Sequence, residues 1–106
     1  MTKPRIDHLA EIYRNILIGA GVRPLVIDTT KQLSRDEALG HCLWVLQEQI
    51  EPLVHRIGGF QEAVRLLGCI QGTVMAFGLC TIEQTREHAR SARMATWDRI
   101  VSSDAH

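Results

Sequence analysis

Thiol and imidazole side chains are the groups in this chain best suited to catalysis or metal binding. They belong to His41, Cys42, Cys69, Cys80 and His88. None of them has the Cys-x-x-Cys or His-x-x-x-His spacing that brings metal ligands together on a turn or helix. Each cysteine lies in an apolar stretch, which is typical of a buried, reduced thiol. The sequence therefore predicts no metal site and no cofactor.

Catalytic motifs are also missing from the sequence. There is no nucleophile motif, and Gly68-x-x-x-Gly72 lacks the Lys-Ser or Lys-Thr that would follow it in a phosphate-binding loop. The acidic residues mostly lie at predicted helix starts or on exposed faces. We therefore expect no catalytic residues and a protein that is not an enzyme.

Two places on predicted apolar surfaces are candidates for binding. His41 and Trp44 are three residues apart, so they share one face of a helix. Trp44 either belongs to the core, capped by a hydrogen bond from His41, or forms a pocket wall for a flat ligand or a partner. Gln71 is the one strongly polar side chain of the longest uncharged run. A buried amide needs a hydrogen-bond partner, which a neighbouring loop, a second copy or a ligand could supply.

Arginines of the last predicted helix form a third candidate. Arg86, Arg90 and Arg93 pair most simply with Glu83 and Glu87 on a solvated face. In a dimer they could instead line an anion-binding groove.

Four helices are expected to position these residues. The first spans residues 5–20, with Pro4 in its first turn and Gly21 as its stop. Its apolar residues follow the spacing of one helix face: Ile6, Leu9, Ala10, Tyr13, Ile16, Leu17 and Ala20.

An irregular extended segment follows, at residues 22–33. Pro24 blocks a helix, and Leu25-Val26-Ile27 is a short β-prone run. The run is either a linker whose side chains fill a gap between helices or an edge strand between two copies.

The second helix is expected to begin with a capping box of Ser34 and Glu37. Pro52 should kink or split it, and because the apolar spacing stays in phase we expect a kink. Gly58-Gly59 ends it. The apolar face is Leu39, Cys42, Leu43, Leu46, Ile50, Leu53 and Ile57.

Residues 60–77 form the expected central helix of the core, and Gly78 ends it. Gly68 and Gly72 leave a flat strip on this helix, which predicts a close backbone contact with the first helix or with a second copy.

The last helix should begin with a second capping box, Thr81 and Gln84, and run to about Val101. His88 is assigned to its polar exterior. Its thin apolar face is Ile82, Ala89, Ala92, Trp97 and Ile100. The sequence thus predicts one all-α domain at residues 1–101 and a frayed tail at 102–106.

The balance between basic and acidic residues limits the kinds of molecule that this protein is expected to bind. Twelve Lys and Arg offset twelve Asp and Glu, so the net charge is zero. This argues against nucleic acid, whose binding needs clustered basic residues, and favours association between copies as a homodimer or higher oligomer. The apolar run at 66–80 is shorter than a membrane span, and the N-terminus lacks the apolar core of a signal peptide. We expect a cytoplasmic protein with no membrane partner.

Two segments resemble a group of short, mostly uncharacterised helical proteins encoded by tailed phages and prophages. They are Leu33-Ser34-Arg35-Asp36-Glu37-Ala38-Leu39-Gly40-His41-Cys42-Leu43-Trp44 and Ala63-Val64-Arg65-Leu66-Leu67-Gly68-Cys69-Ile70-Gln71-Gly72-Thr73-Val74-Met75-Ala76-Phe77-Gly78, the latter followed by Thr81-Ile82-Glu83. The pattern is an acidic helix start leading to His and Trp, then Leu-Gly-x-Ile-Gln-Gly and a glycine stop. Residues 64–66 and 73–75 depart from it, since the group has Asn and Trp among these positions.

The resemblance implies a phage accessory origin and no particular activity. Proteins of this kind and size act by binding. The predicted function is therefore host takeover or anti-defence, by blocking a host protein or by sequestering a small nucleotide signal in the host cytoplasm. The alternative is a structural or assembly role in a phage particle or replication machinery.

Overall fold

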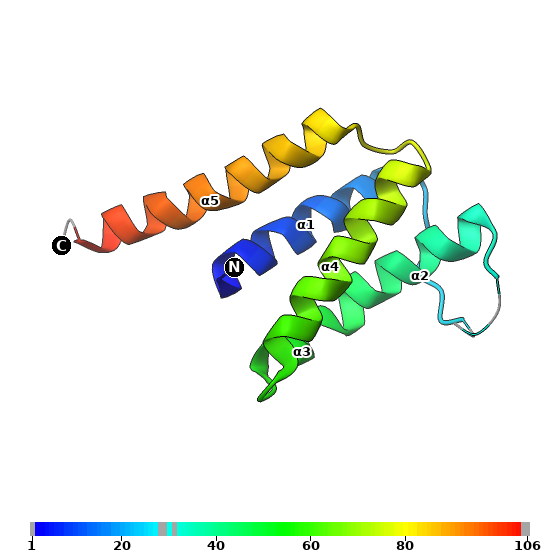
Figure 1. Ribbon diagram of the computed structural model, residues 1–106, viewed down its shortest axis with the longest axis horizontal. Coiled ribbons are helices and arrows are strands. Elements are labelled where there is room, and N and C mark those ends of the chain that lie inside the picture. The colour runs from blue at the N-terminus through cyan, green and yellow to red at the C-terminus, as the bar shows by residue number, and fades with distance from the viewer. Residues whose placement is uncertain (1, 28–29, 31, 105–106) are drawn as a thin grey trace.

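A computed structural model describes residues 2–27, 30 and 32–104, with side chains through residue 94. This part of the chain is helical and contains no strand. It forms a bundle of five helices rather than the four expected (Figure 1). The helices are α1 (Lys3–Gly19), α2 (Arg35–Glu48), α3 (Ile50–His55), α4 (Gly59–Ala76) and α5 (Ile82–Asp104).

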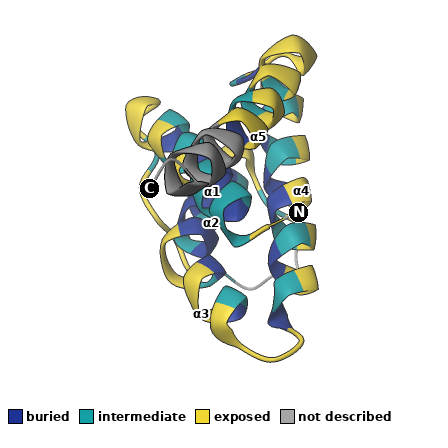
Figure 2. Ribbon diagram, turned by 90° about the vertical axis from the view of Figure 1, so that its left-hand side faces the viewer, coloured by how far each residue is buried: buried dark blue, intermediate teal, exposed yellow. Residues whose placement is uncertain are grey.

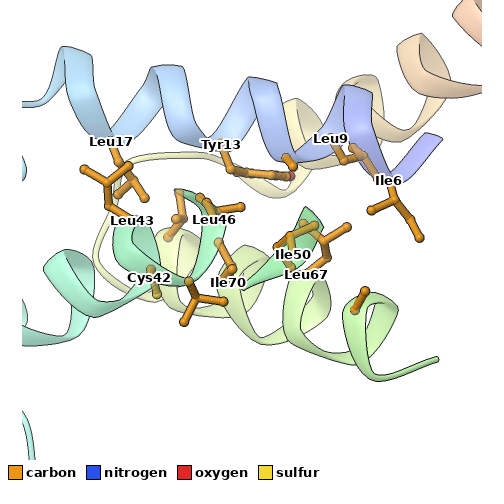
Figure 3. Packing of buried hydrophobic residues seen from close by; sticks show 14 of the residues in the cluster. Ile6, Leu9, Tyr13, Leu17, Cys42, Leu43, Leu46, Ile50, Leu67 and Ile70 are labelled. Carbon is orange, nitrogen blue, oxygen red and sulfur yellow. The ribbon is translucent and has the colours of Figure 1, made fainter. Parts of the chain in front are cut away.

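Helix α1 is the common packing partner of the bundle, because each of the other four helices packs against it. The expectation that α4 would be the central helix is therefore wrong. The buried side of α1 faces α2, α3 and α4 (Figure 3). Its fully buried side chains include Ile6, Tyr13 and Leu17.

The ends of α1 lie close to the predicted positions. A proline occupies the first turn, where a missing N–H costs nothing. After Ala20, Gly21 adopts φ = 80°, the left-handed conformation that favours glycine at a helix end. The N–H of Val22 then donates to the Leu17 carbonyl (3.0 Å), which closes the last turn.

The second expected helix is divided at Gln49, so the predicted kink is a break between α2 and α3. Gln49 has φ = −109°, far from the helical value. Pro52 has no N–H to donate to Glu48, four residues earlier, which weakens the helix at this point. Burial nevertheless stays in phase through Ile50 and Leu53.

The last residue of the apolar face predicted for the second helix is not buried. Helix α3 stops at His55, so Ile57 falls in the following turn, and its side chain is fully exposed. Gly58 turns the chain with φ = 77°, and α4 begins at Gly59.

Both predicted capping boxes are present. The Glu37 N–H donates to Ser34 Oγ (3.3 Å), and the Ser34 N–H donates to Glu37 Oε1 (3.1 Å). Thr81 and Gln84 make the same reciprocal pair at the start of α5, at 3.0 and 2.9 Å. Each box satisfies two donors that the helix itself cannot pair.

Helix α4 lies at the edge of the molecule and buries one of its sides (Figure 2). Gly68 and Gly72 lie on the other side, where both are exposed. A Cβ added at either position would meet no described atom within 4 Å. The glycine strip therefore makes no close contact with α1, and that alternative is wrong.

Helix α5 packs along α1 and extends three residues beyond the expected end (Figure 1). Ala92 is buried against α1, but Ile82 and Ala89 are exposed, so the predicted apolar face is only partly correct. The side chains of Trp97 and Ile100 lie outside the described part, as do residues 105–106 of the predicted tail.

Among the described residues, no helix is both long enough and apolar enough to cross a lipid bilayer.

Candidate functional site

The segment that follows α1 is fixed to α2 through its backbone. The Leu25 N–H donates to the Gly40 carbonyl (3.0 Å), and His41 Nδ1 lies 3.3 Å from the Leu25 carbonyl oxygen. A Cβ added to Gly40 would lie 2.8 Å from the Arg23 carbonyl oxygen and 3.0 Å from Leu25 Cβ. A glycine is therefore required at position 40 for the segment to lie this close to the helix.

This arrangement leaves apolar side chains in solvent. Residues 22–27 have no regular structure, as a linker would. However, Leu25 is 40% exposed and Val26 is 65% exposed, so these side chains do not fill a gap between helices as predicted. The backbone of the segment, rather than its side chains, occupies the space over Gly40.

A groove of about 340 Å³ opens beside the segment. Residues 20–25 form one wall, and Arg35 and Asp36 at the start of α2 form the other. Arg35 Nη1 lies 3.4 Å from Asp36 Oδ1, in an exposed ion pair. We call residues 20–26 with Arg35 and Asp36 the 20–26 surface; it combines exposed apolar side chains with a charged rim.

His41 and Trp44 stand together next to this surface, on α2. Their rings are stacked, with centroids 5.6 Å apart and planes 22° apart. The hydrogen bond of His41 reaches the Leu25 carbonyl, and Trp44 packs partly against the core. His41 therefore holds the extended segment, a role that neither prediction included, while Trp44 lies against the core as the first of the two predictions has it.

Gln71 hydrogen-bonds a residue that the sequence did not suggest. Its Nε2 donates to the hydroxyl of Tyr13 (3.1 Å), and Nδ1 of His88 lies 3.2 Å from the same oxygen. The Tyr13 side chain is fully buried, and this burial raises its pKa. One phenol oxygen thus joins α1, α4 and α5, and the partner of the Gln71 amide nitrogen lies on a helix rather than in a neighbouring loop.

The sequence did not indicate that Tyr13 and His88 would form a hydrogen-bonded group with Gln71. The apolar spacing places Tyr13 on the buried face of the first helix, and the charge pattern places His88 on the polar exterior of the last. A tyrosine in the middle of an otherwise apolar face is a usable signal, because its buried hydroxyl must find a partner. Which residue supplies that partner depends on how the helices cross.

The arginines of α5 lie elsewhere. Arg90 forms a two-point contact with Glu87, as predicted, through Nε to Oε2 (3.1 Å) and Nη2 to Oε1 (2.8 Å). The hydrogen bond from Arg90 lowers the pKa of the Glu87 carboxyl. Arg86 and Arg93 are exposed. The six expected binding residues therefore fall in three places. His41 and Trp44 lie beside the 20–26 surface, and Gln71 lies at the Tyr13 hydroxyl. The three arginines lie on α5.

Burial suppresses the reactivity of two of the three thiols. Burial raises the pKa of the Cys42 and Cys80 thiols, so both are protonated at neutral pH and are poor nucleophiles. Within the described ranges, no three His, Cys, Asp or Glu side chains gather into a group that could hold a metal ion. The Tyr13 hydroxyl is buried among its partners.

Comparison of the chain with protein-family models, curated proteins and solved structures found no match.

Proposed function

We propose that this chain is a non-enzymatic accessory protein of phage type that binds and blocks a host protein, in host takeover or anti-defence. The proposal rests on one observation: Leu25 and Val26 are held exposed by a backbone that is hydrogen-bonded to α2. Scattered exposed apolar residues are ordinary. Here Leu25 and Val26 project from a segment whose backbone is already held in place. Binding of a partner to these side chains therefore costs little conformational entropy.

The surroundings of these side chains suit a protein partner. Protein interfaces combine an apolar centre with a polar rim, and Arg23, Arg35 and Asp36 line the same groove as Leu25, next to Val26 in the chain. Sequestration of a nucleotide is less favoured, because the arginines expected to hold an anion lie on α5, whereas the stacked ring pair lies on α2.

Capture from host-cell lysate tests the proposal with two matched variants. Val26→Asp places a charge in the apolar centre of the 20–26 surface. Ile57→Asp does the same at an exposed apolar residue in the turn after α3. We expect one host protein in stoichiometric amount with the wild type and with Ile57→Asp, and its loss with Val26→Asp.

Equal capture by both variants would refute the role of the surface. A rise in melting temperature with adenine nucleotides would instead favour nucleotide sequestration, since a ligand of the native state stabilises it. No host partner and no nucleotide effect would favour the structural or assembly role.

A further inference from the structure

Two of the three cysteines of this chain open onto the same groove. Cys42 on α2 and Cys69 on α4, far apart in the sequence, both line an apolar groove of about 200 Å³ between these helices. Cys42 lies on the side of α2 that faces α4 (Figure 3). The third cysteine, Cys80, follows α4 and does not line the groove. The fold therefore brings together one particular pair of thiols.

Thr73, which also lines the groove, contacts both of these cysteines. Its hydroxyl donates to the carbonyl oxygen of Cys69, one turn earlier on α4 (2.8 Å). Burial raises the pKa of the Cys42 thiol, a hydrogen bond with Thr73 partly opposes this shift, and charge on Cys69 adds to it. Because a hydrogen bond acts only at contact distance, the Cys42 sulfur lies beside the side chain that is bonded to Cys69.

The two thiols of the groove differ in their exposure to solvent. Cys69 is exposed, although its apolar stretch predicts a buried thiol, whereas Cys42 is buried. An oxidant in solution therefore reaches Cys69 first. Redox-sensing cysteines are typically exposed and stand next to a second cysteine that attacks the oxidised sulfur. The groove provides both: an exposed thiol that can be oxidised and a shielded thiol beside it.

We propose that Cys42 and Cys69 form a redox pair, which hydrogen peroxide converts from two thiols into a disulfide that ties α2 to α4. In the first step the Cys69 sulfur attacks a peroxide oxygen, the O–O bond breaks, and Cys69 becomes a sulfenic acid with release of water. In the second step the Cys42 sulfur attacks the Cys69 sulfur. The S–S bond forms, the S–O bond breaks, and the oxygen leaves as a second water. Each sulfur loses one electron, and the peroxide gains both.

His41 is the base for the second step. A carbonyl oxygen can only accept a hydrogen bond, so the contact with the Leu25 carbonyl places a proton on Nδ1 of His41. In the neutral ring Nε2 is then a proton acceptor, and His41 lines the same groove as the two thiols. Because burial keeps the Cys42 thiol protonated, its attack needs such an acceptor. Nε2 takes the thiol proton and returns it to the departing oxygen.

The test exposes the folded full chain to a small molar excess of hydrogen peroxide and maps disulfides by digestion and mass spectrometry without reductant. We expect a link between Cys42 and Cys69 of one chain, which thiol reductants reverse. Two matched variants each remove one buried thiol. Cys80→Ser should form the same link, because Cys80 lies outside the groove. Cys42→Ser should form no link within the chain and should accumulate oxidised Cys69.

Two results would overturn the redox pair: a link to Cys80 in place of the link between Cys42 and Cys69, or a wild type in which Cys69 is oxidised but no link forms. The rate of linking tests His41 separately. His41→Gln, with its helix content checked by circular dichroism, should link more slowly than the wild type and gain less speed between about pH 6 and about pH 8. An unchanged rate and pH profile would refute the role of His41. Host capture by the 20–26 surface is a separate measurement, so either proposal can fail alone.

Discussion

The hydroxyl of Tyr13 on α1 lies 3.2 Å from Nδ1 of His88 on α5, and the two rings meet edge to face at 5.3 Å. Gln71 donates to the same oxygen, and the phenol O–H can be donated to Nδ1 of His88. That hydrogen bond needs a neutral imidazole with Nδ1 as the acceptor. A second contact between the same helices joins His8 Nε2 and Ser91 Oγ at 3.1 Å. Polar contacts therefore contribute directly to how α5 docks on α1.

The first prediction is that acid weakens the fold through His88. Burial lowers the pKa of His88 below its ordinary value of 6.5, and the Glu87 carboxylate only partly opposes this. The folded state therefore binds fewer protons than the unfolded state, and stability falls as the pH drops through about 6.5 towards the lower folded value.

Urea unfolding at about pH 7.5 and about pH 5.5 checks this dependence. His88→Gln removes the titrating group, so its stability should change less between the two pH values than that of the wild type. His55→Gln is the control, because His55 is exposed and its ring hydrogen-bonds Glu51 (2.8 Å) on the same helix rather than a side chain of another helix. If His88→Gln keeps the full wild-type dependence, the His88 explanation is wrong.

A second prediction concerns the phenol oxygen itself. Tyr13→Phe should lower the free energy of unfolding by about 1–3 kcal/mol, because it leaves the Gln71 amide and the His88 ring without their partner. In a double-mutant cycle, Gln71→Met should cost less in the Tyr13→Phe background than in the wild type. Additive costs would mean that the two side chains act independently. Chemical denaturation of the four variants gives the comparison.

The sequence predicted those features whose signals lie within a few residues of one another. Periodicity located α1 and α4, and the Ser34 and Thr81 capping boxes each depend on a contact over three positions. The Tyr13 hydroxyl, in contrast, meets residues 58 and 75 positions away, and these meetings depend on how helices cross. Likewise, the Gly68–Gly72 spacing defines a strip but does not indicate whether that strip faces α1 or solvent.

Position 59 provides a third prediction, about backbone contact. A Cβ added to Gly59 would run into the Leu53 carbonyl oxygen and would lie 3.2 Å from Leu53 Cα. The α3–α4 turn must therefore shift in Gly59→Ala, and we expect a loss of about 1–3 kcal/mol in unfolding free energy. Gly19→Ala adds the same methyl group in open space and should cause no such loss. Thermal and urea unfolding of both variants distinguishes a local clash from a general effect of alanine.

The fourth prediction separates the extended segment from the rest of the fold. Gly40→Ala inserts a methyl group between α2 and the Arg23 carbonyl, so the segment should move off the helix. Hydrogen exchange of the Leu25 amide, now bonded to the Gly40 carbonyl, should become faster, while amides in α1 and α4 stay protected. Under the proposed function, host capture should weaken in the same variant. Unchanged Leu25 exchange would show that the segment is not held by this contact.

The position of α1 as the shared partner of every other helix has a consequence for synthesis. The ribosome makes α1 before any helix that covers it, so its apolar side emerges bare and is covered in stages as α2, α3 and α4 follow. Tyr13 acquires its last partner only when α5 has emerged. The nascent chain therefore cannot complete the packing around α1 until α5 has been translated, and the exposed side of α1 is where a chaperone would bind in the meantime.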